Sequence, residues 1–172
     1  MQAGEEVAMA GESAAVTPDF ATFFAEEHPR VFRALFFVVG NRADAAELAQ
    51  DAFLKLWERW DSVGQLDDPT AYLFTIALNG FRMRVRSARR AARRLVVHDT
   101  AIDPFEEVTV RDDVRRMLLS LAPRQRAALV LLDLYGYGSE DAAHILGVRA
   151  STVRALASQA RAALRSMEAR DE

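Results

Sequence analysis

Arginine is the residue type whose spacing first suggests chemistry in this chain. Seven arginines fall within residues 82–94, and no acidic residue interrupts them. Such a run can be the solvated end of a helix, where cations suit the helix dipole. Because no acid compensates these charges, we interpret the run as a surface for an anionic partner such as nucleic acid.

A second basic surface follows a helical period near the C-terminus. The outward positions of a helix predicted over residues 151–167 carry small or basic side chains: Ser151, Arg154, Ser158, Arg161 and Arg165. Small residues let a backbone approach the major groove closely, and arginines there reach phosphates or guanine edges. A short helix over residues 139–146 and a turn at Gly147 precede it, which predicts a helix-turn-helix. The alternative is an ordinary helix pair with a solvated basic face.

Residues 44–60 predict an amphipathic helix with an unusual polar face. Its core-facing stripe recurs at helical spacing and comprises Ala45, Leu48, Ala49, Ala52, Phe53, Leu56, Trp57 and Trp60. The opposite face carries Glu47, Gln50, Asp51, Lys55 and Glu58, with Leu54 in its middle. Leu54 is either one of the many single exposed leucines of proteins or the anchor of a docking face for a basic partner.

Catalytic and metal-binding patterns are weak by comparison. Asp141 with His144, or Glu27 with His28, has a spacing that helical bundles use for metals. The histidines at 28, 98 and 144 are scattered, however, and no nucleophile elbow or glycine-rich phosphate loop is present. We therefore expect no catalysis, no cofactor and no metal site.

The elements that position these residues are expected to be helices throughout. The chain has 172 residues, of which 51% are hydrophobic, with 8 glycines, 5 prolines and no cysteine. No apolar run approaches the roughly 20 residues of a membrane span, so we expect a cytoplasmic protein without membrane insertion. The fold class is predicted as all-α, with two small helical domains joined by a flexible linker and the helix-turn-helix in the C-terminal one.

Domain boundaries follow from changes in composition. Residues 1–17 are small, acidic and aperiodic, which predicts a disordered tail. The first helical domain is predicted over residues 18–95, an acidic linker over 96–110 and the second domain over 111–168. In the first domain Pro29 marks a break or the first turn of a second helix, and residues 61–68 form a loop. Asp68 and Pro69 predict the start of the next helix.

Taken in order, three stretches resemble the sigma factors of the extracytoplasmic-function (ECF) type, which initiate bacterial transcription. ADAAELAQDAFLKLWERW is similar to that family's polymerase-binding helix in its second conserved region. PTAYLFTIALNGFRMRVRSARR is similar to the helix that opens and reads the −10 promoter element. The stretch from LAPRQRAALVLL to the helix-turn-helix ASTVRALASQARAAL resembles the fourth region, which reads the −35 element.

The resemblance implies a role for each surface. The residues that would bind core RNA polymerase are Glu47, Gln50, Asp51 and Leu54. Those that would contact the −10 element are Asn79, Arg82, Arg84, Arg86, Arg89 and Arg90. Those that would contact the −35 element are Ser151, Thr152, Arg154, Ser158, Arg161 and Arg165. The loop over residues 61–68 and the start of the next helix resemble the place where such factors capture a flipped −10 base. An anti-sigma factor is a further implied partner.

One alternative function stays open, and the sequence departs from the family's pattern at several positions. A helix-turn-helix regulator of another family would bind DNA without core polymerase, and its first block would hold a ligand pocket or a dimer interface. The departures include Leu78 and Met83 in the helix similar to the −10 reader, and Leu156, which stands where the family usually has a second arginine in its recognition helix. The helix therefore predicts no particular promoter sequence.

Overall fold

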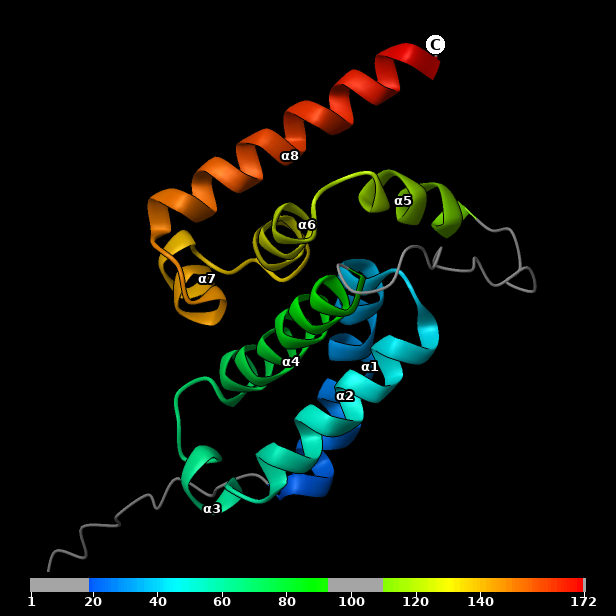
Figure 1. Cartoon of the computed structure of the whole chain (residues 1–172). Coiled ribbons are helices and arrows are strands. Elements are labelled where there is room, and N and C mark those ends of the chain that lie inside the picture. The colour runs from blue at the N-terminus through cyan, green and yellow to red at the C-terminus, as the bar shows by residue number, and fades with distance from the viewer. Residues whose placement is uncertain (1–18, 93–109, 172) are drawn as a thin grey trace, which may run out of the picture.

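The computed structural model describes residues 19–92 and 110–171 (Figure 1). All regular structure within those ranges is helical, which confirms the predicted fold class. The predicted tail over residues 1–17 and the predicted linker, apart from Val110, lie outside the described residues. A bilayer-spanning helix would need a long apolar stretch, and none of the helices in the described ranges has one.

The first block contains four helices: α1 Phe20–Val39, α2 Arg42–Trp57, α3 Trp60–Val63 and α4 Pro69–Ala92. Gly40 ends α1 in the left-handed conformation, with φ of 83°. The side chain of Asn41 then caps α2 by accepting a hydrogen bond from the Asp44 amide at 3.0 Å. Asp68 caps α4 in the same way through the Ala71 amide at 2.8 Å, as the sequence predicts.

Two local predictions in this block are wrong. Pro29 neither breaks a helix nor starts one, because α1 continues through it. Pro29 lies on the exposed side of α1, while Val31, Ala34 and Leu35 hold the following turns against the core. The predicted loop over residues 61–68 is also helical in part, because α3 occupies its beginning.

The second block contains α5 Val110–Leu119, α6 Pro123–Leu129, the π-helical segment η1 Val130–Leu134, α7 Ser139–Leu146 and α8 Ala150–Asp171. Gly147 turns the chain between α7 and α8 with φ of 62°, which completes the predicted helix-turn-helix. After Pro123 the sequence predicts a helix that ends in Gly136 and Gly138, whereas in the structure this helix ends with the π-helical segment at Leu134.

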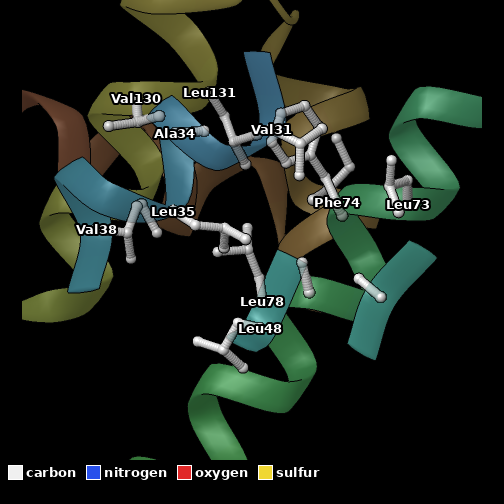
Figure 2. Close-up of a cluster of buried hydrophobic side chains, with 14 of the residues drawn as sticks. Val31, Ala34, Leu35, Val38, Leu48, Leu73, Phe74, Leu78, Val130 and Leu131 are labelled. Carbon is white, nitrogen blue, oxygen red and sulfur yellow. The ribbon is translucent and has the colours of Figure 1, made fainter. Parts of the chain in front are cut away.

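The two blocks share one apolar core. Buried side chains of α1, α2 and α4 belong to the same cluster as those of η1 and α7. Figure 2 shows Leu131 of η1 beside Val31 and Ala34 of α1, with Phe74 of α4 on the same side of the cluster. In Figure 1, α4 of the first block lies directly under α6 and α7 of the second. The helix predicted to read one promoter element is thus packed against the motif predicted to read the other.

Candidate functional site

The polar face of α2 presents all four residues predicted to bind polymerase. Glu47, Gln50, Asp51 and Leu54 are exposed, and Leu54 keeps 50% of its surface accessible. We call this surface the acidic face. The buried stripe behind it holds six of the eight predicted core residues, from Ala45 to Leu56. The helix is therefore fixed by its apolar side, and the acidic face is free to meet another molecule.

Trp57 is a residue that the sequence analysis placed wrongly. It was expected in the core, yet 61% of its surface is exposed. Trp60, three residues further on, is the tryptophan that packs toward the core, half-buried against the rings of Phe20 and Phe23. Trp57 stands three residues after Leu54, a spacing that makes side chains neighbours on a helix. That spacing was the available signal that Trp57 extends the acidic face.

Arg84 of α4 also belongs to the acidic face. Its guanidinium contacts both carboxylate oxygens of Glu47, Nη1 to Oε2 and Nη2 to Oε1, each at 2.9 Å, and Asp51 Oδ2 at 3.3 Å. The hydrogen bond with Glu47 is the main cause that raises the pKa of Arg84. The resemblance assigned Arg84 to DNA, but in the structure it joins two acids of the other predicted surface.

The other predicted −10 residues lie along α4 in two different settings. Asn79 and Arg82 are half-buried, and Arg82 donates to Asn79 Oδ1 at 2.6 Å and to the Leu146 carbonyl of α7 at 2.5 Å. Arg86 and Arg90 are exposed, whereas the side chain of Arg89 lies outside the described part. Arg86 and Arg90 are thus the residues of this set whose side chains are described and exposed to solvent.

A cleft of about 420 Å³ lies between α4 and the second block, beside the contact of α4 with α7. Its walls are largely apolar, including Phe81 and Val85 of α4 and Val148 beyond α7. Every charged residue that lines it is an arginine: Arg82, Arg86 and Arg124. Leu156 lines the same cleft, so this position of α8 faces the first block rather than the outward face of the helix.

The outward face of α8 presents all six predicted −35 residues to solvent: Ser151, Thr152, Arg154, Ser158, Arg161 and Arg165. Two of their side chains have partners within the second block. Arg154 donates to Ser139 Oγ at 3.2 Å, and Arg161 forms a two-pronged pair with Asp133 of η1, with Nε to Oδ2 at 3.1 Å. This hydrogen bonding with Asp133 raises the pKa of Arg161. The face remains exposed and predominantly basic.

A smaller pocket of about 250 Å³ lies where the start of α4 meets α7. Asp68, Tyr72 and Thr75 line it from the first block, and Asp141 and His144 line it from the second. Burial, together with the charge of Asp68, raises the pKa of the neighbouring Tyr137. The acids and His144 are not gathered as metal ligands would be, and the described part of the chain contains no such group of three.

Two family profiles match the chain, one on each block. The profile described as Sigma-70 region 2 matches residues 23–91. The profile described as Sigma-70, region 4 matches residues 111–164. The first match covers the acidic face and the arginines of α4, and the second covers the helix-turn-helix.

Curated relatives match along most of the chain. ECF RNA polymerase sigma factor SigM of Mycobacterium tuberculosis is 30% identical over 155 residues, which cover 84% of this chain and 74% of SigM. ECF RNA polymerase sigma factor SigE of Mycolicibacterium smegmatis is 31% identical over 166 residues, which cover 90% of this chain and 63% of SigE. The probable ECF sigma factor SigI of M. tuberculosis is 31% identical over 139 residues. The chain spans about half the length of SigI, at 47%, and less than two thirds of SigE.

Solved structures with the same arrangement of helices include two chains bound to other proteins, one of which is named a sigma factor. Sigma factor RpoE of Bartonella quintana, in complex with the anti-sigma factor NepR, has a TM-score of 0.74 and 27% identity over 90% of this chain and 99% of RpoE. CnrH, in complex with the cytosolic domain of CnrY, has a TM-score of 0.61 and 25% identity over 89% of each chain.

Proposed function

The chain belongs to the extracytoplasmic-function RNA polymerase sigma factors, and on that premise we propose that it binds core RNA polymerase and directs it to specific promoters. In this role it recognises the −35 element and opens the −10 element. The observation that carries the proposal is the presence, in one chain, of an exposed acidic face, an arginine-rich helix and an exposed recognition helix. The family membership also excludes the alternative of a regulator from another helix-turn-helix family, because the first block matches Sigma-70 region 2.

The acidic face supplies the polymerase contact. Leu54 and Trp57 are exposed apolar side chains, with Glu47, Gln50 and Asp51 on the same helix. Apolar and aromatic residues at the centre of an interface contribute most of its binding energy once water is excluded. Acids around them favour a basic partner and speed the encounter with it. This pattern supports docking on a basic helical surface of the core enzyme.

Recognition of the −35 element falls to α8. The N-terminal half of a recognition helix enters the major groove, which places Ser151, Thr152 and Arg154 at base edges. Arg161 and Arg165, further along the helix, contact phosphates, and Arg161 gives up its pairing with Asp133 to do so. The exposure of this whole face supports the assignment.

Opening of the −10 element falls to α4 and the residues before it. Arg86, Arg89 and Arg90 neutralise backbone phosphates and release counterions. The start of α4 next to Asp68 and Tyr72 receives an unstacked base, and an aromatic platform offsets the few kcal/mol that unstacking costs. The pocket at this place supports the assignment.

Regulation by an anti-sigma factor is part of the same proposal. RpoE of B. quintana, which matches 90% of this chain, was crystallised with NepR. We propose that an anti-sigma factor also binds this chain. The proposal further includes a cytoplasmic location and no catalysis, cofactor or metal.

The test uses purified full-length chain and core RNA polymerase. Co-elution and promoter-dependent run-off transcription are measured for the wild type, for Leu54→Arg and for Val114→Arg. Val114 is 46% exposed on α5 and serves as the matched control, since it lies away from the acidic face. We expect Leu54→Arg alone to abolish binding and transcription. Equal binding by all three proteins, or binding by none, would overturn the proposal.

A further inference from the structure

The cleft beside α4 has the size and the lining of a site for a small molecule. Its volume of about 420 Å³ falls in the range of about 300–1,000 Å³ that ligand pockets occupy. Such pockets typically combine apolar walls with a few polar groups that fix the orientation of the ligand. The proposed function gives the apolar interior of this cleft no role, although Arg86, which lines it, is assigned to DNA.

The apolar wall of the cleft is built from separate parts of the chain. Phe81 and Val85 lie one turn apart on α4, and Val148 belongs to the turn between α7 and α8. Leu156 adds the recognition helix, whose outward positions are otherwise small or basic. All four side chains are half-buried, so each keeps apolar surface that a ligand can cover. Removing that surface from water favours a ligand with an apolar stem.

The charges of the cleft all have one sign. Its charged residues are Arg82, Arg86 and Arg124, and none of the described residues that line it is an aspartate or a glutamate. Arg82 is already bonded to Asn79 and to the Leu146 carbonyl. Arg86 and Arg124 are exposed, and neither forms an ion pair with an acid in the described ranges. One guanidinium on each block is therefore available to an anion.

The uncharged polar side chains of the cleft are paired with each other. Gln125 of α6 donates its amide to Gln159 Oε1 of α8 at 3.3 Å. The amide oxygen of Gln125 accepts from the Ala122 backbone at 3.0 Å. These glutamines give a cation no negative charge to bind, so the polar end of a ligand is recognised by the arginines.

From this lining we infer that the cleft binds an amphipathic carboxylate, a molecule with one anionic head and an apolar stem, such as a medium-chain fatty acid. The head pairs with Arg86 and Arg124, because guanidinium groups match the two oxygens of a carboxylate and form charge-assisted hydrogen bonds with them. The stem covers the apolar wall that includes Phe81 and Leu156. Neither polymerase nor DNA takes part in this binding, so it can be tested apart from the proposed function.

The ligand class is tested by isothermal titration calorimetry on the full chain, with decanoate as the probe. Decanol and decyltrimethylammonium carry the same stem with no charge and with the opposite charge. We expect saturable binding of one decanoate per chain. We expect decanol to bind about tenfold more weakly, the effect of losing one charge-assisted contact, and the cation not to bind. No saturable binding of decanoate, or equal binding of the three compounds, would overturn the inference.

The apolar wall is tested by Leu156→Gln, with Leu134→Gln as the matched control. Leu134 is 47% exposed and does not line the cleft. We expect Leu156→Gln to weaken decanoate binding about tenfold, because part of the stem then faces a polar group. Leu134→Gln should bind decanoate as the wild type does. Equal effects of the two substitutions would place the stem outside the cleft and contradict the inference.

The anionic head is tested by Arg124→Glu, with Arg33→Glu as a control of equal charge change. Arg33 is exposed on α1 and does not line the cleft. We expect Arg124→Glu to abolish the preference for decanoate over decanol, and Arg33→Glu to keep it. Circular dichroism checks the folding of every variant. If the folded variants all bind decanoate like the wild type, the ligand lies elsewhere and the inference fails.

Discussion

Arg84 and Glu47 lie 37 residues apart in the sequence and form a two-pronged ion pair on the surface of the first block. Asp51 contacts the same guanidinium at 3.3 Å. The pair links α4, the helix assigned to DNA, to the acidic face of α2. An arginine whose charge is already matched by two carboxylates releases few counterions on binding DNA, because its charge is not available to phosphate.

The first prediction contrasts Arg84 with Arg86, an exposed arginine on the same helix. We expect Arg86→Gln to lower the salt dependence of DNA binding by about 0.9 in the slope of log K against log salt, the contribution of one phosphate contact. We expect Arg84→Gln to leave that slope nearly unchanged. Fluorescence anisotropy with duplex DNA over a range of salt concentrations measures both. An equal decrease of the salt slope in both variants would show that Arg84 also contacts phosphate.

The second prediction concerns Arg126 and its three carbonyl partners. Burial lowers the pKa of its guanidinium, but the helix ends supply acceptors that compensate its charge. Arg126→Met leaves those carbonyls without a donor, and we expect a loss of about 2–4 kcal/mol in the free energy of unfolding. Arg124→Met, at an exposed position of the same helix, is expected to change it by less than about 0.5 kcal/mol. Urea denaturation measures the free energy of unfolding of both variants. Similar midpoints for the two would contradict the stabilising role of the Arg126 hydrogen bonds.

The third prediction concerns Gly40, where a methyl group would meet the Leu119 side chain at 2.2 Å and the backbone has φ of 83°. Gly40→Ala therefore combines a left-handed backbone with a clash, and we expect a loss of about 2–4 kcal/mol of stability. Gly136→Ala shares the positive φ but has open space, so about 1–2 kcal/mol is expected from the backbone alone. Adding Leu119→Ala should recover part of the loss only for Gly40→Ala. Thermal unfolding measures the stability of Gly40→Ala and Gly136→Ala, each with and without Leu119→Ala. Equal recovery in both pairs would contradict the clash at Gly40.

The fourth prediction is a pH dependence. Burial is the main cause that raises the pKa of Tyr135 to about 12 from its ordinary value of 10.0. Because the folded value is higher than the unfolded one, the neutral phenol stabilises the fold fully below pH 10, and this contribution is lost as the pH rises toward 12. We expect Tyr135→Phe to remove that part of the alkaline dependence. Ultraviolet titration of phenolate absorbance, with urea unfolding at each pH, checks the prediction; an unchanged titration curve in Tyr135→Phe would contradict it.

Local chemistry made much of the fold predictable. Gly147 and the pair Asp68 and Pro69 mark helix ends where the structure has them, because caps and turns depend on neighbouring residues. The stripe from Ala45 to Leu56 was predictable for the same reason, since helical spacing alone decides which side is buried. The exposure of the predicted polymerase and −35 residues followed from that spacing.

The misplaced residues depend on long-range contacts. Trp57 has the spacing of a core residue but is exposed, and it is Trp60 that packs against the phenylalanines of α1. Arg84 belongs to an uninterrupted run of arginines, and only the packing of α4 on α2 brings acids beside it. Arg126 gives no signal in the sequence, because its acceptors are backbone carbonyls of distant helices.

The π-helical segment η1 sets a limit on how the length of this chain can change. Its closing bond runs from the Tyr135 amide to the Val130 carbonyl, so this turn holds one residue more than an α-helical turn. Deleting one residue from this turn would leave an ordinary α-helical turn, and the residues after it would keep nearly the same direction. A deletion within α6, which holds no extra residue, would instead rotate everything after it by about 100°. The ion pair of Asp133 with Arg161 and the contact of Tyr135 with Phe74 depend on that direction. This helix should therefore tolerate the loss of one residue at η1 and nowhere else along its length.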